Sequence, residues 1–266
     1  MKQFLLSKEP DQDGAIRIDG SDYHYLVRVR RLAAGEFFTA RLPGGEETQV
    51  RIKSIDSRTL IGECLLNTDG SQQVERRCNT NCGNIIPPII LFQSLPKGDK
   101  MDLIARQAAE GGITEIVPFT SEFSVAKKLS AESQKFTRWE KIIKEARQQS
   151  GSRISTDLHK PLTITELFEF WKEQKDGGAL GLLFHHQGLE QESLHRYLYS
   201  EPKTIVLVIG PEGGFSDREV TLFLENGFKP LTIGDTILRT ETAALYCAAA
   251  IRILLLEKNT WELKQV

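Results

Sequence analysis

Short runs in which apolar and polar residues alternate fill residues 1–66, and turn-forming residues separate them. Alternation with a period of two is typical of strands that bury one face, and the spacing of these runs suits a small antiparallel barrel. A helical pattern, DYHYLVRVRRL (22–32), interrupts the strands and stops at Gly35. The expected strands lie within 14–18, 36–42, 48–55 and 59–66.

The pattern changes at residue 89, where the apolar runs become continuous and alternate with helical segments. Strands that are apolar on both faces and separated by helices indicate a parallel α/β sheet. The clearest helix, 135–151, gathers its apolar residues on one face, as an amphipathic helix does. The expected strands lie within 89–95, 114–119, 179–184, 204–210 and 230–235, and the apolar helix face consists of Phe136, Trp139, Ile142, Ile143 and Ala146.

This change of pattern predicts two domains joined by a polar segment. The stretch NTDGSQQVERRCNTNCGNIIPP (67–88) is polar, contains glycine and ends in two prolines, which is typical of a linker. We therefore expect a small β-barrel domain over 1–72, a linker over 73–88 and an α/β domain over 89–266.

Composition and charge narrow the functional classes. The 266 residues carry a formal net charge of −2, so any contact with RNA has to come from local basic patches. The start of the chain does not match a signal peptide, and the apolar run 243–256 is too short to span a bilayer. We expect a cytoplasmic protein with free thiols and no membrane contact. Cys78 and Cys82 have no second ligand pair in the sequence, so no metal site is expected.

The segment IGPEGGFS (209–216) places a glycine-rich turn directly after the strand TIVLV. Its glycines let the backbone approach a ligand closely, and S-D-R-E from Ser216 is typical of a capping box that starts a helix. The turn matches neither a Walker loop nor a dinucleotide-binding motif, and the carboxylate of Glu212 would repel a phosphate. The pattern favours a ligand read by backbone groups, although a purely structural turn has the same pattern.

A second turn lies in IGDTILRTETA (233–243), where Thr240 or Thr242 can cap the helix that follows. That helix is apolar nearly all round, which predicts a core element whose large side chains are buried. Arg239 in the turn either pairs with an acidic residue such as Glu241 or reaches an RNA or substrate group beside the ligand. The apolar residues expected to be buried include Leu245, Ile251, Ile253 and Leu254.

Taken together, these segments resemble the SPOUT methyltransferases, and most closely the bacterial family that methylates N3 of a uridine in 16S ribosomal RNA. The resemblance covers nearly the whole chain, and its two glycine-turn motifs are rather specific as a pair. The matching motifs are HYLVRVRRLAAGE (24–36), LFQSLPKGDKMDLI (91–104), RWEKI with EARQQSG (138–151), VIGPEGGFS (208–216) and IGDTILRTETA (233–243).

The resemblance implies a parallel sheet with a trefoil knot in the C-terminal domain and a PUA-like RNA-binding barrel in the N-terminal domain. It also implies a homodimer that holds S-adenosylmethionine in backbone loops of the knot and acts on 16S rRNA within the small ribosomal subunit. A sulfonium cofactor carries no phosphate, so the carboxylate in the glycine turn is tolerable beside it. Carried over onto this chain, the cofactor residues are Leu182, Leu183, Phe184, Gly210, Pro211, Glu212, Gly213, Gly214, Ile233, Gly234, Ile237 and Leu238.

Methylation of a uridine at N3 requires loss of the N3 proton and stabilisation of the anion that develops. We expect Arg239 to stabilise that anion and Thr240 or Thr242 to donate hydrogen bonds. No residue stands out as a general base, although His185 and His186 follow a strand and are candidates for lining the site. The residues expected to contact RNA are Arg28, Arg30, Arg31, Lys97, Lys100, Arg138, Arg147 and Arg153.

Three positions depart from the family pattern. The family usually has leucine where Gly111 stands and arginine where Phe123 stands, and it often has arginine at Thr236. The loss of two charged contacts leaves other interpretations open. These are a non-catalytic RNA-binding or ribosome-assembly protein, a SPOUT enzyme with another RNA target, and an α/β nucleotide-binding protein.

Overall fold

The computed structural model describes residues 3–65, 86–124, 134–185, 188–232 and 234–258. The chain forms two compact units, of which the first comprises residues 1–81 with 148–153 and the second 82–147 with 154–266. The predicted linker 73–88 lies mostly outside the described residues, so its boundaries stay a prediction. Within the described ranges no helix is both long and apolar enough to cross a membrane.

The N-terminal unit is a five-stranded sheet in the order β1-β3-β4-β5-β2. All neighbours in it are antiparallel except β1 and β3, which run parallel. Buried and exposed residues alternate along β4, which is why its sequence has a period of two. The strands are β1 (Phe4–Leu5), β2 (Ala15–Asp19), β3 (Phe37–Arg41), β4 (Glu47–Ile55) and β5 (Thr59–Leu65).

The predicted helix over 22–32 is present but short and irregular. It begins as α1 (Gly20–Tyr23) and continues as a π-helical turn over His24–Val29. Leu26 is fully buried in the core of this unit, whereas Arg28, Arg30 and Arg31 are exposed. Arg31 adopts the left-handed conformation with φ of 56°, which ends the helix there rather than at Gly35.

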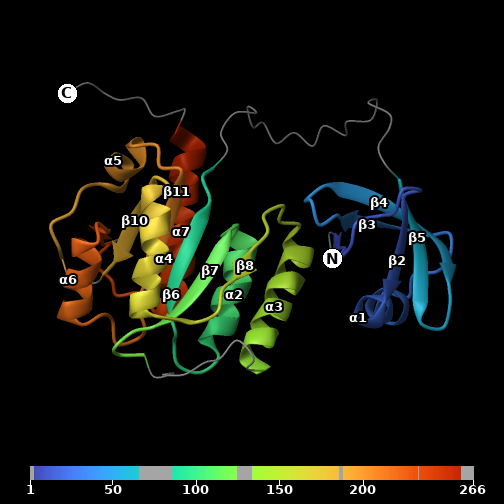
Figure 1. Ribbon diagram of the computed structural model, residues 1–266, viewed down its shortest axis with the longest axis horizontal. Coiled ribbons are helices and arrows are strands. Elements are labelled where there is room, and N and C mark those ends of the chain that lie inside the picture. The colour runs from blue at the N-terminus through green and yellow to red at the C-terminus, as the bar shows by residue number, and fades with distance from the viewer. Residues whose placement is uncertain (1–2, 66–85, 125–133, 186–187, 233, 259–266) are drawn as a thin grey trace. The chain divides into compact units, whose positions relative to one another are not determined.

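The C-terminal unit contains a parallel sheet in the order β12-β10-β11-β6-β7-β8, with β9 paired to β7 beyond this path (Figure 1). Each residue of β6 is buried, in agreement with the continuous apolar run IILFQS. The strands are β6 (Ile89–Ser94), β7 (Glu115–Thr120), β8 (Asp157–Leu158), β9 (Leu162–Thr163), β10 (Ala179–Phe184), β11 (Thr204–Ile209) and β12 (Lys229–Leu231).

Helices cover both faces of this sheet and create two apolar cores. One core joins the sheet to α2, α3, α5 and α7, and the other joins it to α4 and α6. The predicted apolar face of α3 is confirmed, since Phe136, Trp139, Ile143 and Ala146 are buried and Ile142 is partly buried against the same core. The helices are α2 (Lys100–Gly111), α3 (Gln134–Ser150), α4 (Ile164–Asp176), α5 (Leu194–Tyr199), α6 (Asp217–Glu225) and α7 (Thr240–Glu257).

Helix α7 is less buried than its composition predicts. Ile251 is fully buried, but Leu245 is 37% exposed and Ile253 is 54% exposed, so the prediction that both are buried is wrong. Neither predicted threonine caps the helix, because Arg239 occupies the N-cap position and Thr240 is already its first residue. An apolar composition does not distinguish a side chain that faces the core from one that faces another surface.

The order of the strands determines where loops meet. Strand β11 lies between β10 and β6 and is parallel to both. The carboxyl ends of the three strands, at Phe184, Ile209 and Ser94, therefore lie at one edge of the sheet. Ligands of open α/β sheets bind at this edge, and the glycine turn follows β11 there.

Gly181 in β10 tests how tightly the second core is packed. A Cβ at this position would lie 2.5 Å from Cδ1 of Phe228 and 2.9 Å from Trp171. We expect Gly181→Ala to lower the free energy of unfolding by about 1–3 kcal/mol because the aromatic rings cannot move apart without strain. Urea denaturation measures the change, with Gly188→Ala as control because no atom lies within 4 Å of its added Cβ. Equal stability of the two variants would contradict the expectation.

Candidate functional site

A cavity of about 580 Å³ opens at the carboxyl edge of the parallel sheet. Its wall consists of the turn after β11, the turn before α7 and the residues that follow β10 and β12. These segments lie far apart in the sequence and meet because their strands are neighbours in the sheet. A cavity of this size is in the range that holds a small organic ligand or cofactor.

The first turn, residues 210–216, is shaped by its glycines and by the start of α6. Phe215 lies so close to Gly210 that an added Cβ would come within 3.2 Å of the ring. Gly214 has a φ of 71°, a conformation that strains other residues. The predicted capping box is confirmed, because Ser216 and Glu219 exchange backbone and side-chain hydrogen bonds at the N-terminus of α6.

The second turn, residues 234–239, leads into α7 and carries exposed side chains along the cavity. Gly234 has a φ of 74°, and Asp235, Ile237 and Arg239 line the cavity. Ile237 is 78% exposed and adds an apolar side chain to the wall. Ile233, predicted as a cofactor residue, lies outside the described residues.

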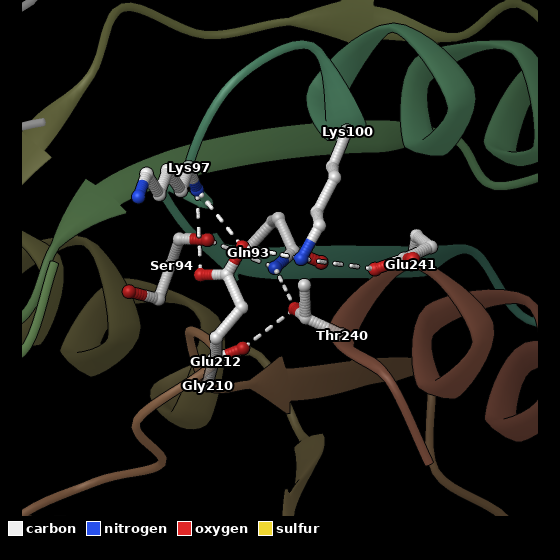
Figure 2. A network of polar contacts seen from close by, with 8 residues as sticks. All are labelled: Gln93, Ser94, Lys97, Lys100, Gly210, Glu212, Thr240 and Glu241. Carbon is white, nitrogen blue, oxygen red and sulfur yellow. Dashed lines mark hydrogen bonds and ion pairs between the residues drawn. The ribbon is translucent and has the colours of Figure 1, made fainter. Parts of the chain in front are cut away.

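The two turns are joined by a chain of side-chain hydrogen bonds (Figure 2). The Thr240 hydroxyl donates to the carbonyl oxygen of Gly210 at 2.6 Å and accepts from Nε2 of Gln93 at 3.0 Å. Gln93 is fully buried in β6 and Thr240 is only 5% exposed, so water does not compete for these groups. We call this chain the Gln93–Thr240–Gly210 clasp, and it fixes the start of α7 to the glycine turn.

A second network ties the glycine turn to the loop before α2 (Figure 2). Glu212 accepts hydrogen bonds from the backbone N–H of Lys97 at 3.1 Å and from Nζ of Lys100 at 2.7 Å. Lys100 also lies 3.9 Å from a carboxylate oxygen of Glu241. Burial opposes ionisation of Glu212, but the hydrogen bonds from Lys100 and from backbone N–H groups hold its pKa below the usual value.

The three predicted catalytic residues lie in different environments. Arg239 lines the cavity, is exposed, and its guanidinium forms no ion pair or hydrogen bond with the residues that the structure describes. It therefore does not pair with Glu241, which was the alternative interpretation of the sequence. Thr240 lines the cavity, but its hydroxyl is engaged in the clasp, which does not fit a donor to the substrate. Thr242 is exposed and is not part of the cavity wall.

Most of the predicted cofactor residues lie in the cavity wall, with one shift of register. Leu182 and Leu183 are fully buried within β10, and the wall begins one residue later, at Phe184 and His185. His186 lies outside the described residues. The predicted residues found in the wall are Phe184, Gly210, Pro211, Glu212, Gly213, Gly214, Gly234, Ile237 and Leu238.

Sequence reasoning missed Cys247 as a wall residue because it lies inside the apolar pattern of α7. It is 2% exposed, and burial raises the pKa of its thiol. Leu231, Thr232, Phe215 and Ala243 also line the cavity without having been predicted. Leu231 ends strand β12 and Thr232 follows it. Both could have been predicted, because β12 ends at the same edge of the sheet as the other strands that border the cavity.

The residues predicted to contact RNA are dispersed. Lys100 lines the cavity and pairs with Glu212, and Arg138 pairs with Asp102, so both are neutralised in this structure. Arg147 is half-buried. The exposed members of the set are Arg28, Arg30, Arg31, Lys97, Arg138 and Arg153.

The cavity wall combines backbone access with apolar surface and charges of both signs. Glycines leave the backbone uncovered, Phe184 and Leu238 add apolar surface, and the charged side chains are Lys100, Glu212, Asp235 and Arg239. Among the described residues no cluster of three His, Cys, Asp or Glu side chains could hold a metal ion.

Thr240→Val tests the clasp, because it removes the hydroxyl and keeps the shape of the side chain. The carbonyl of Gly210 and the amide of Gln93 would lose their partner, so the free energy of unfolding should fall by about 1–3 kcal/mol. Amide hydrogen exchange over 210–214 should become faster. Thr240→Ser keeps the hydroxyl and should stay near the wild type in both measurements. Unchanged exchange in Thr240→Val would exclude the clasp as the support of the turn.

Comparison with known proteins supplies the family. Residues 84–252 match the RNA methyltransferase domain, and residues 18–63 match the RNA methyltransferase PUA domain. A Synechocystis protein named ribosomal RNA small subunit methyltransferase E is 31% identical over 95% of this chain and 78% of its own length. The protein named ribosomal RNA small subunit methyltransferase E 2 from Borreliella burgdorferi is 31% identical over 97% of this chain and all of its own length.

Solved structures agree with these matches. A Legionella pneumophila protein in complex with the bound cofactor SAM is 26% identical, with a TM-score of 0.76 and coverage of 95% of this chain and 97% of that one. A ribosomal RNA small subunit methyltransferase E from Neisseria gonorrhoeae, bound to S-adenosyl methionine, shares the fold at 24% identity and a TM-score of 0.76, over 96% of this chain and 98% of that one. The chain thus belongs to the ribosomal RNA small subunit methyltransferase E family.

Proposed function

We propose that the protein transfers a methyl group from S-adenosylmethionine to N3 of a uridine in the 16S rRNA of the small ribosomal subunit. The observation that carries this proposal is the cavity formed by two glycine-containing turns that the Gln93–Thr240–Gly210 clasp joins. Membership of the methyltransferase family supports it, and so does the cofactor bound to the Legionella relative.

In this proposal the backbone of the two turns binds the cofactor. Gly210, Gly213 and Gly214 line the cavity without side chains, so a ligand can approach the backbone closely, and the ring of Phe184 offers an apolar surface to a nucleobase. When bound, the cofactor supplies an electrophilic methyl group on a sulfonium. The clasp keeps the two turns in register, so the backbone groups are already in position before the cofactor arrives.

Arg239 is the group that we assign to the acceptor base. Uridine N3 becomes a nucleophile only when its proton leaves, and the resulting negative charge spreads onto the carbonyl oxygens of the ring. A guanidinium that lines the cavity and has no partner among the described residues can stabilise this charge. Thr240 acts as a positioning residue, because its hydroxyl holds Gly210.

RNA binding is assigned to basic side chains of both units. Arg28, Arg30 and Arg31 are exposed at the end of the π-helical turn and pair with no residue that the structure describes. They lie in or beside the segment that matches the PUA domain, which supports an RNA-binding role for the predicted domain 1–72. Lys97 adds a cation near the cavity, since its backbone N–H contacts Glu212.

The exposed apolar side of α7 supports a homodimer. Leu245, Tyr246, Ile253 and Leu256 are 37%, 51%, 54% and 53% exposed, and their spacing places them along one side of the helix. A continuous apolar stripe on the surface of a soluble protein marks an interface. A second copy of the chain is its proposed partner, in line with the family resemblance, and the trefoil knot likewise stays a prediction of that resemblance.

The test of the proposed function is methyl transfer to small subunits from cells that lack this protein. We expect labelled methyl to appear on a uridine of 16S rRNA, and mass mapping to place it at N3. Arg239→Ala should lower turnover about 100-fold or more and leave affinity for S-adenosylmethionine nearly unchanged in calorimetry. Arg106→Ala, an exposed arginine outside the cavity wall, is the matched control.

Three outcomes would contradict this assignment. Cofactor binding without methyl transfer would favour the non-catalytic RNA-binding protein or another RNA target. Tight binding of ATP in place of S-adenosylmethionine would favour a nucleotide-binding protein. Normal turnover of Arg239→Ala would remove the role of this residue.

Ile253→Glu tests the dimer. A carboxylate in the centre of the apolar stripe should prevent association because it would be buried without a partner. Sedimentation should show a dimer for the wild type and a monomer for the variant. Val29→Glu, another exposed apolar residue in the N-terminal unit, should remain dimeric. A wild-type protein that sediments as a monomer at micromolar concentration would refute the dimer.

A further inference from the structure

Phe123 is an exposed aromatic residue beside the cavity that the proposed chemistry does not use. It is 48% exposed and lies in the turn Ser121–Ser124, directly after the carboxyl end of β7. A Cβ added at Gly213 would lie 3.1 Å from Cβ of Phe123, so the absence of a side chain at 213 permits this close contact. Because Gly213 lines the cavity, Phe123 lies beside a residue of the cavity wall.

A buried hydroxyl triangle holds this turn from below. Oγ of Ser94 lies 2.9 Å from Oγ of both Ser121 and Ser124, which are themselves 3.2 Å apart. The Ser124 hydroxyl also accepts the backbone N–H of Ser121 at 3.0 Å. All three serines are at most 4% exposed, so their hydroxyls satisfy one another without water. The triangle thereby anchors the turn to the end of β6.

A buried carboxylate holds the same turn from the side of α6. Oε1 of Glu219 accepts the backbone N–H of Glu122 at 2.9 Å, and its Oε2 accepts the N–H of Ser216. The Ser216 hydroxyl in turn donates to the side chain of Glu122 at 2.7 Å. The residues on both sides of Phe123 are therefore fixed, while its ring remains about half exposed to solvent.

A rigid backbone that holds an aromatic ring in water is suited to stacking. Unpaired RNA bases are recognised by stacking on aromatic side chains, and this works for any base because each has a π-face. Binding at this position loses little conformational entropy of the backbone, since the turn is already fixed before a ligand arrives.

The carboxylates near Phe123 are hydrogen-bonded within the protein, and one cation, Lys97, can contact a nucleic acid. The backbone of Lys97 contacts Glu212, the neighbour of Gly213 in the chain. Its ammonium forms no ion pair or hydrogen bond with the described part of the protein, and in Figure 2 it points away from the Glu212–Lys100 pair. A phosphate beside a base stacked on Phe123 would find this cation.

We propose that Phe123 is the stacking surface for an unpaired base of the substrate RNA beside the cavity. The proposal rests on the proposed function for the nature of the substrate. Stacking is not a contact between charges, so the contribution of Phe123 to binding should not depend on salt.

The experiment measures equilibrium binding of the protein to small subunits from cells that lack it, at several salt concentrations. Phe123→Leu should weaken binding roughly five-fold to a hundred-fold, as expected for the loss of one stacked base. Phe123→Trp should keep wild-type affinity. In both variants the slope of log K against log salt should stay unchanged, whereas Lys97→Gln should make the slope about 0.7 less steep. Affinity for S-adenosylmethionine should match the wild type throughout.

Each alternative has its own result. Wild-type affinity of Phe123→Leu for subunits would overturn the proposal. Loss of cofactor affinity or of stability in Phe123→Leu would make the ring a support of the glycine turn, and loss of self-association would make it a contact between protein copies; either would overturn it too. Binding assays do not depend on catalysis, so a wild type that binds subunits without methylating them would refute the proposed function alone. A wild type that binds no RNA would refute both.

Discussion

The hydrogen bond from the Thr240 hydroxyl to the carbonyl oxygen of Gly210 is the contact on which the site depends. It joins two segments that are thirty residues apart in the chain, and Gln93 supports it from strand β6. Both side chains are buried, so the bond forms in a medium where an unmade partner is costly. Because the glycines have no side chains, a ligand can approach the backbone of the turn closely. The hydrogen bond from Thr240 keeps the same turn rigid.

The parallel sheet explains why such a contact is possible at all. Strands β10, β11 and β6 end at one edge, and each is followed by a segment that contributes to the cavity or to its support. Helix α7 packs against the same sheet through Ala248 and Ile251. This packing fixes the position of the second turn, which leads into α7, relative to the sheet. The order of the strands thus brings the turns around the cavity together, and the hydrogen bonds of Gln93 and Thr240 fix the distance between them.

Much of the fold and part of the site follow from sequence patterns. Continuous apolar runs predicted the parallel strands, and the spacing of Ser216 and Glu219 predicted the start of α6, because both signals are local. The start of α7 was predicted wrongly because the partner of Thr240 is a distant carbonyl, which no local pattern reveals. Ile253 was expected in the core, since composition reports an apolar side chain but not the surface that covers it. The position of Phe123 likewise depends on the serine triangle, whose members come from the end of β6 and from the turn after β7.

The buried thiol of Cys247 has a chemical consequence for the proposed sulfonium cofactor. An ionised thiol is a strong nucleophile, and within the cavity wall it would compete with the RNA for alkylation. Burial raises the pKa of the Cys247 thiol above its ordinary value, because the surrounding helix and sheet cannot solvate a thiolate. With the proposed cofactor bound, the same packing would lower the fraction of nucleophilic thiolate in the cavity wall still further.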